Sequence, residues 1–186
     1  MQISDQILSM QDDCVRIRRD LHRIPEIGFR LYDTQAYVRK ELEACGPDSL
    51  ETLALTGLKA VFYAKGAEKT LAFRADMDAL RSEETNDVPY RSCREGAMHG
   101  CGHDGHTTIL LLLAKWIAKN RKKLRCNVVL LFQPGEEGWA GARRMIGRRA
   151  GKSQSGSNLR SAPVADGSEG QGRCALGLSD GADERF

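Results

Sequence analysis

The segment 98–106 combines residues whose side chains can hold a metal ion. It reads Met-His-Gly-Cys-Gly-His-Asp-Gly-His, so a thiol, three imidazoles and a carboxylate lie within nine positions. Thiolates and neutral imidazoles are the ligands that zinc and similar divalent ions prefer. The intervening glycines permit the tight turns that would bring Cys101 and His103 to one ion. An ion needs further donors, and the clearest are Glu136 and Glu137 in the later sequence Gln-Pro-Gly-Glu-Glu-Gly.

Two pairs of carboxylates follow strand-like segments. Asp76 and Asp78 come after one such segment, and Glu136 and Glu137 come after the apolar run 127–132. Neighbouring side chains in extended backbone point in different directions, so one glutamate can bind a metal while the other faces a water molecule. A carboxylate placed there can take the proton of that water during attack on a carbonyl. An acidic loop at a helix N-terminus is the simpler account of one Glu-Glu pair, but it does not explain three groups of donors at one place.

Hydrophobic periodicity predicts alternating helices and strands around these residues. The predicted helices cover residues 4–24, 33–45 and 107–120, and the predicted strands cover 58–64, 70–74 and 127–132. The polar segment 81–97 is predicted to be irregular. This order predicts an α/β fold, and the continuous apolar character of 127–132 is typical of a strand inside a three-layer sheet with helices on both faces. Because ligands gather outside the carboxyl ends of strands in such sheets, the carboxylate pairs and the 98–106 segment should meet at one edge.

A second histidine and carboxylate lie in the predicted structured connection 21–29, which overlaps the end of the first predicted helix before Pro25. His22 and Glu26 could be site residues. A loop histidine paired with a nearby carboxylate is the interpretation that we favour.

Length, charge and cysteine usage restrict the class of protein. The 186 residues suffice for one principal domain, predicted to span 1–146, and the glycine- and serine-rich part 147–186 is predicted to be a disordered tail without catalytic residues. The net charge of +3 and the scattered basic residues give no sign of nucleic-acid binding. The sequence also lacks a membrane-spanning or signal-type apolar run, so we expect a cytoplasmic protein, with its six cysteines mostly reduced.

Four ordered segments resemble the M20 metallopeptidase family, and most closely its amidohydrolase branch of hippurate hydrolases, N-acyl amino acid amidohydrolases and N-acetyldiaminopimelate deacetylases. The segments are 18–26, 73–80, 98–106 and 132–138. The resemblance implies the N-terminal part of a zinc-peptidase-like catalytic domain that hydrolyses the amide bond of N-acyl amino acids with two divalent ions, Zn or Mn.

The resemblance also implies roles for individual residues. It assigns metal binding to Cys101, His103 and Glu137, and the general base to Glu136. The acidic residue that orients the site is either Asp76 or Asp78, and the His-x-Asp pattern more usual in the family aligns its aspartate with Asp78.

The chain also departs from that family. Family members are considerably longer, often form homodimers through an inserted domain, and carry two further metal-binding histidines, whereas this sequence has no histidine after His106. The resemblance ends near Ile146, as a shift of reading frame would produce. The alternative function is therefore an inactive truncated fragment that binds metal weakly. A nucleotide- or CoA-binding module is disfavoured because no glycine-rich phosphate-binding fingerprint is present.

Overall fold

The computed structural model describes residues 4–147, which form a four-stranded sheet and the helices packed on it. The helices are α1 (Asp5–Leu8), α2 (Gln11–His22), α3 (Tyr32–Glu43), α4 (His103–Lys119) and α5 (Gly141–Ile146), with a 3-10 turn η1 (Arg121–Lys123) after α4. The strands are β1 (Ser49–Leu53), β2 (Gly57–Phe62), β3 (Thr70–Asp76) and β4 (Asn127–Gln133). This is a mixed α/β fold, as the alternation of elements predicts.

The sheet has the strand order β1-β2-β4-β3. The pairs β1/β2 and β2/β4 are antiparallel, whereas β3 and β4 are parallel, with a register that runs from Thr70 opposite Asn127 to Asp76 opposite Gln133. A parallel pair needs a long crossover connection, and α4 provides it here. Because β3 and β4 end at the same edge, the residues that follow them emerge side by side. Their first contact beyond the strands is the bond from the Met77 N–H to the Gln133 carbonyl, at 2.9 Å.

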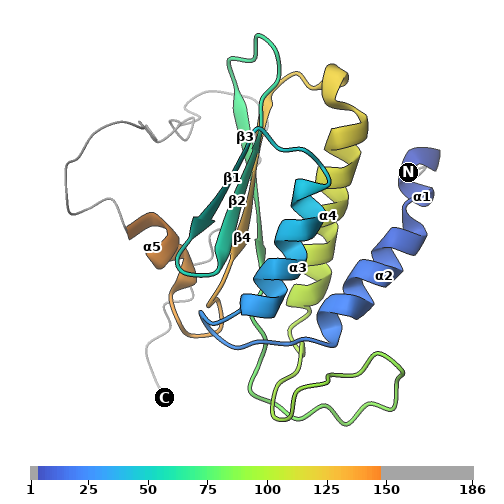
Figure 1. Ribbon diagram of the computed structural model, residues 1–186, viewed down its shortest axis with the longest axis vertical. Coiled ribbons are helices and arrows are strands. Elements are labelled where there is room, and N and C mark those ends of the chain that lie inside the picture. The colour runs from blue at the N-terminus through green and yellow to red at the C-terminus, as the bar shows by residue number, and fades with distance from the viewer. Residues whose placement is uncertain (1–3, 148–186) are drawn as a thin grey trace, which may run out of the picture. The chain divides into compact units, whose positions relative to one another are not determined.

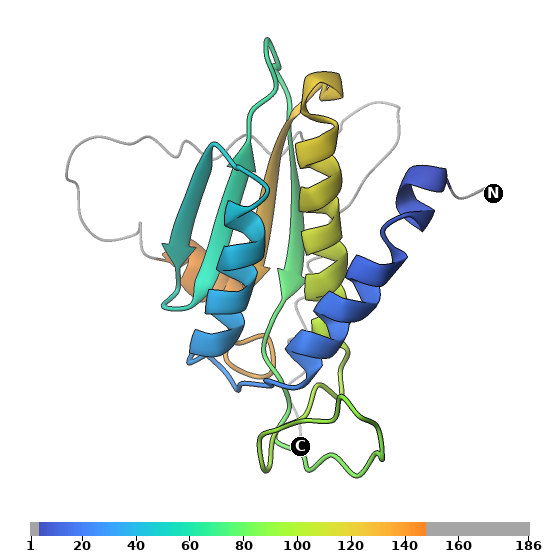
Figure 2. The same ribbon diagram turned by 45° about the vertical axis from the view of Figure 1, so that its right-hand side comes forward.

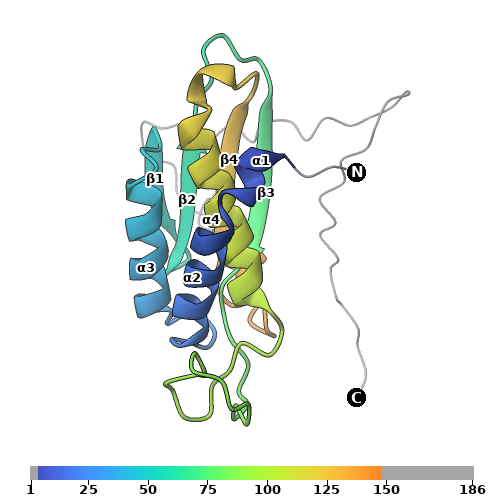
Figure 3. The same cartoon turned by 90° about the vertical axis from the view of Figure 1, so that its right-hand side faces the viewer.

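Helices lie on both sides of this sheet. Figures 1 and 3 show α2, α3 and α4 side by side on one face, and Figure 2 shows the short α5 on the opposite side from α3. Alternate residues of the central strands form the core beneath the three helices. This core includes Leu58, Ala60, Phe62, Leu130, Phe132, Leu111, Ile117, Val38, Leu42, Ile17 and Leu21, all less than 2 % exposed.

An ionic network joins the outer sides of α2, α3 and α4. The Arg16 guanidinium lies 3.0 Å from a carboxylate oxygen of Asp13 and 3.1 Å from one of Glu41. The Lys115 ammonium lies 2.9 Å from the other oxygen of Glu41. Glu41 is the least exposed member of the network, so it links the three helices through two cations.

The first predicted helix is two helices in the structure. The apolar period continues from α1 into α2, but the helix breaks at Ser9 and Met10, where the Ser9 hydroxyl donates to the Gln6 carbonyl. Such a local side-chain bond competes with the helical backbone pattern. Ser4 lies at the N-cap position as its type suggests, although its side chain makes no capping bond.

Two further elements differ from the sequence expectations. Strand β1 has no predicted counterpart because it is a short edge strand of mixed polarity with no buried residue. Helix α4 begins at His103 rather than at Thr107, directly after Gly102, whose φ of 82° only glycine adopts readily. The earlier start places His103 and His106 in the first turn of the helix.

Other expectations concern cysteines, membranes and the chain end. The five cysteines within residues 4–147 are all free thiols. Over that same range, no helix combines the length and the apolar character needed to cross a bilayer. The predicted tail, except for Gly147, falls outside the described residues.

Candidate metal centre

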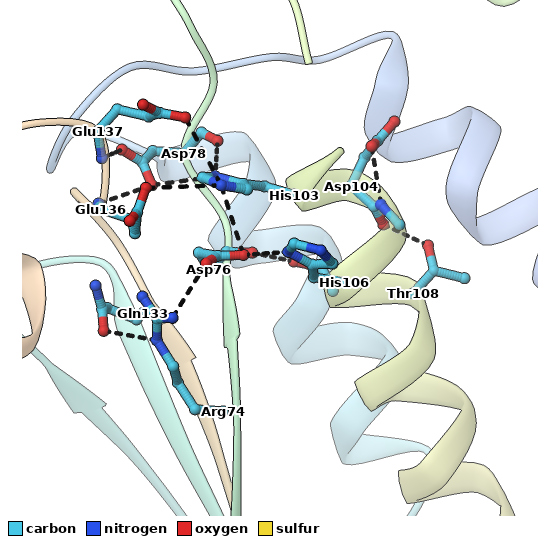
Figure 4. A network of polar contacts seen from close by, with 12 residues as sticks. Arg74, Asp76, Asp78, His103, Asp104, His106, Thr108, Gln133, Glu136 and Glu137 are labelled. Carbon is cyan, nitrogen blue, oxygen red and sulfur yellow. Dashed lines mark hydrogen bonds and ion pairs between the residues drawn. The ribbon is translucent and has the colours of Figure 1, made fainter. Parts of the chain in front are cut away.

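Asp78 organises the loops that leave β3 and β4. Its side chain is fully buried, and its two carboxylate oxygens accept the backbone N–H groups of Glu136 and Glu137, at 2.9 and 3.0 Å. Its backbone carbonyl lies 2.8 Å from Nδ1 of His103. Figure 4 shows these groups meeting where β3, β4 and α4 come together. One aspartate therefore fixes both the Glu-Glu loop and the imidazole.

The hydrogen bond to Asp78 determines the orientation of His103. A carbonyl oxygen can only accept, so Nδ1 carries a proton and Nε2 faces the other carboxylates. Nε2 lies 3.7 Å from Oδ1 of Asp76, 3.7 Å from Oε2 of Glu136 and 3.7 Å from Oε1 of Glu137. Burial alone would lower the pKa of His103, but Asp78 and Asp76 outweigh it and raise that pKa to about 9.

Cys101 completes a group of metal donors with this imidazole. Ligand atoms of Cys101, His103 and Glu137 all lie within 4.8 Å of one another. Oε1 of Glu137 is buried and has no hydrogen-bond partner in the described part of the chain. Burial and the neighbouring Glu137 carboxylate raise the pKa of the Cys101 thiol. A bound divalent cation would coordinate Oε1 of Glu137, which accepts no hydrogen bond. It would also stabilise the thiolate form of Cys101 and so lower the pKa of that thiol. The donor set therefore fits a metal ion.

Asp76 and His106 lie beside this group. Nδ1 of His106 lies 2.6 Å from Oδ1 of Asp76, and the Arg74 guanidinium lies 3.2 Å from Oδ2. Burial would raise the pKa of Asp76, but the hydrogen bond from His106 and the charges of His103 and Arg74 lower it. Asp76 is therefore a carboxylate, and Oδ1 is its oxygen on the side of His103.

His22 does not join the metal donors. It is the last residue of α2 rather than a loop residue, and its partners are distant in sequence: Nδ1 lies 2.6 Å from Asp104 and Nε2 lies 3.1 Å from Glu84. Arg18 is also paired with Asp104, at 3.0 Å. All three side chains that meet here, His22, Asp104 and Glu84, are at most 4 % exposed. This buried triad connects α2, the residue after His103, and the irregular segment 81–97.

Glu26 has a structural role as well. Its side chain accepts the backbone N–H of Thr34 at 2.8 Å, in the first turn of α3, and its carbonyl accepts the N–H of Ala79 at 2.7 Å. The favoured sequence interpretation, a structural rather than a site role for His22 and Glu26, agrees with these contacts. The partner of His22 is nevertheless not the nearby carboxylate that we expected.

Four residues near the site were assigned no individual role from the sequence. Asp104 and Glu84 belong to the buried triad. Their contacts with His22 could not be predicted from the sequence because they lie 82 and 62 residues away from it in the chain. His99 is 4 % exposed, both of its ring nitrogens lack a partner among the described residues, and burial lowers its pKa to about 4. His106 stands three positions after His103, a helical spacing that could have paired them had the helix start been placed correctly.

The fold and the donor set define an α/β protein with a candidate metal centre at the carboxyl ends of two parallel strands. The chain belongs to peptidase family M20/M25/M40, whose family model matches residues 72–178. It is 41% identical over 146 residues to a hippurate hydrolase from Campylobacter jejuni and 41% identical over 133 residues to an N-acetyldiaminopimelate deacetylase from Anoxybacillus flavithermus. These matches cover 78% and 71% of the chain. The resemblance to the M20 family stated from the four segments is confirmed.

Solved structures agree with this assignment. A dinuclear metal-binding peptidase of the M20 family from Bacillus subtilis has a TM-score of 0.71 and 33% sequence identity, and the match covers 77% of this chain. The chain spans only part of each relative: 38% of the hippurate hydrolase, 35% of the deacetylase and 40% of the Bacillus subtilis structure. The matches therefore identify the family and the fold of this chain, and they do not by themselves assign it the activity of the longer relatives.

Proposed function

We propose that this chain carries the metal-binding half of the active site of an amidohydrolase that acts on N-acyl amino acids. The observation that carries the proposal is the convergence of Cys101, His103 and Glu137, where a buried carboxylate oxygen of Glu137 accepts no hydrogen bond from the described residues. The relatives named for hydrolysis of acylated amino acids support the substrate class. This oxygen, Oε1 of Glu137, accepts no hydrogen bond from the described residues, and its ion-pair partner, Nε2 of His103, lies 3.7 Å away, so a cation at this place would satisfy it.

The residues would divide the work as follows. Cys101, His103 and Glu137 would hold a divalent ion, Zn or Mn, which when bound supplies Lewis acidity to the amide carbonyl and acidifies a water molecule. Glu136 has a 41% exposed side chain beside the cluster, so its carboxylate can reach a water and accept the proton. Asp78 would be the orienting acid, because it fixes both glutamates and His103.

Adjacent glutamates can separate these two tasks because their exposures differ. The Glu137 side chain is 25% exposed and presents its buried Oε1 to the cluster, whereas Glu136 opens more widely to solvent. Metal ligation suits the buried oxygen, and proton transfer with a small-molecule substrate suits the exposed one. The relatives contain a second ion in at least one case, and the remaining ligands for it would come from outside the described residues.

The test is metal analysis of the purified full chain together with hydrolysis of N-acetyl and N-benzoyl amino acids. We expect Cys101→Ser to lower zinc affinity by at least about tenfold, since ligand loss exceeds the effect of a lost supporting bond. Glu136→Gln should keep zinc and lower kcat by about 10² to 10⁴. Glu43→Gln, at a 60% exposed glutamate on α3, is the matched control and should change neither.

Two results would contradict the proposal in different ways. Zinc binding that Cys101→Ser leaves unchanged would refute the assignment of Cys101, His103 and Glu137 as the metal site. Stoichiometric zinc binding without turnover of any acyl amino acid would refute the hydrolase activity and leave the alternative, a chain that binds metal without catalysis.

A further inference from the structure

Trp139 is a large apolar residue that lies partly open to solvent two positions after Glu137. It is 47% exposed, and its indole packs edge-on against Phe29, with ring centroids 6.5 Å apart and planes 80° apart. Cζ of Arg144 lies 4.2 Å from the centre of the Phe29 ring. Phe29 is therefore held between a cation and the indole, and Phe29 and Trp139 together form an aromatic wall with one partly open side.

The aromatic wall touches the backbone directly before Glu136. A Cβ built on Gly135 would lie 2.9 Å from Cζ of Phe29 and 3.1 Å from Cβ of Trp139. A Cβ built on Gly28 would lie 3.2 Å from Cε2 of the indole. Both glycines have a positive φ, 67° at Gly135 and 70° at Gly28, so each supplies a close approach and a turn that other residues supply poorly. The wall is therefore packed against the loop that carries the proposed general base.

The same loop fixes the place of Trp139. It is closed by a hydrogen bond from the Gly141 N–H to the Gly135 carbonyl, at 2.9 Å. Ala140, directly after Trp139, has a φ of 52°, a conformation that a residue with a Cβ adopts only at an energetic cost. Strained backbone of this kind persists where the surrounding structure imposes it, and it is concentrated at binding sites. Trp139 is therefore held in a defined position relative to Glu136.

The chemistry of the wall suits a flat apolar group. The proposed reaction brings the amide of the substrate to Glu136, and an N-acyl amino acid carries one substituent on each side of that amide. Binding sites for small molecules are lined mainly by apolar and aromatic side chains, and aromatic rings attract one another beyond the area that they bury. A substrate with an aromatic ring can therefore gain contact with Trp139, whereas a substrate with only an acetyl group and glycine has no ring to place there.

We propose that Phe29 and Trp139 form a substrate subsite that binds an aromatic group of the N-acyl amino acid. This inference rests on the proposed function and adds substrate selectivity to it. Trp139 contacts a part of the substrate that does not react, and Phe29 supports the indole from behind. The subsite therefore raises kcat/KM for substrates that carry a ring and leaves the others unchanged.

The first experiment compares the hydrolysis of three substrates by the full chain supplied with zinc. N-benzoylglycine carries a ring on the acyl side, N-acetylphenylalanine carries one on the amino acid side, and N-acetylglycine carries none. Trp139→Ala should lower kcat/KM by at least about tenfold for one or both aromatic substrates and by less than about twofold for N-acetylglycine. The substrate that loses more identifies the side of the amide that the subsite binds. Trp139→Phe should keep most of the aromatic preference.

Tyr63→Ala is the matched control. Tyr63 is also an exposed aromatic residue, at 59%, but it follows the end of β2 that pairs with the start of β4, and so lies at the opposite edge of the sheet from Glu136. Its replacement should change kcat/KM for none of the three substrates.

Tryptophan fluorescence measures binding without turnover. The chain has two tryptophans, Trp116 and Trp139, and Glu136→Gln should bind substrates without hydrolysing them. An aromatic substrate should change the emission of this variant, and N-acetylglycine should not. Adding Trp139→Phe should abolish the change, although Trp116 remains.

The possible outcomes separate the subsite from the proposed function. Equal losses of kcat/KM for all three substrates in Trp139→Ala, or an aromatic preference that this variant retains, would overturn the subsite and leave the proposed function intact. An emission change that depends on Trp139, in a chain that hydrolyses none of the substrates, would refute the hydrolase activity and support the subsite. Absence of both turnover and an emission change would overturn both.

Discussion

Replacement of His22 by alanine should destabilise the fold far more than a surface substitution. His22 is 4 % exposed and bridges Asp104 and Glu84, whose side chains are 0% and 1% exposed. Removing one partner of a buried pair costs about 3 to 5 kcal/mol, because the remaining charge stays buried. Arg18 still pairs with Asp104, at 3.0 Å, so the cost should be at the lower end, about 3 kcal/mol. Small domains are stable by only about 5 to 15 kcal/mol, so this loss is a large part of the total.

The assay is urea unfolding of the full chain with and without the substitution. An unchanged slope with a lower midpoint would show that the folded state lost stability. Arg16→Ala is the control, since this cation is 45% exposed and its loss should cost less than about 1 kcal/mol. A cost for His22→Ala no larger than that of the control would refute the reasoning.

Two further measurements test the network behind this prediction. His22→Ala and Asp104→Asn should be non-additive, with the double variant costing less than the sum, because both disrupt one network. Asp104 follows His103 directly, so loss of the triad should also lower zinc affinity by about tenfold although no ligand is touched. Full additivity, or unchanged zinc affinity in a folded His22→Ala variant, would show that the triad does not support the metal centre.

Two other predictions concern packing and acid stability. Gly141→Ala would place a Cβ 1.8 Å from the Pro134 carbonyl oxygen, so it should lower the free energy of unfolding by about 1 to 3 kcal/mol in the urea assay. Gly147→Ala is the control, because a Cβ at that position meets no atom within 4 Å, and it should have little effect. Burial would raise the pKa of Glu41, but its two cationic partners, Arg16 and Lys115, outweigh this and lower the pKa below 4.5. The contribution of Glu41 to the free energy of unfolding is therefore present above pH 4.5 and is lost as the pH falls through the pKa of the folded state. Glu41→Gln should therefore cost about 0.5 kcal/mol at pH 7 and reduce the fall in urea midpoint on acidification, and an unchanged acid profile would contradict this assignment.

Some features of the structure could be predicted from local sequence. The apolar run 127–132 is a strand as predicted, although only its alternate residues Val128, Leu130 and Phe132 are fully buried. The periodic residues of α2 and α3 face the core, because side-chain periodicity reports which side of an element is buried. Local reasoning failed at the break after α1 and at β1. After α1 the apolar period continues in the sequence, but the hydrogen bond of the Ser9 hydroxyl accompanies a break in the helix. Strand β1 is an edge strand without a buried residue, so its sequence shows no alternation of apolar and polar residues.

The sequence by itself determined the donor types around Cys101 and His103 and the carboxylates that could join them, since thiol, imidazole and paired acids are properties of the residues. The tertiary structure decided which of them meet. Asp78 reaches Glu136 and Glu137 only because β3 and β4 pair in parallel. Such pairing is set by hydrogen bonds between segments far apart in the chain. The periodicity of one segment does not indicate which other strand will pair with it. The contacts of His22 with Asp104 and Glu84 had the same origin, and no local pattern could predict them.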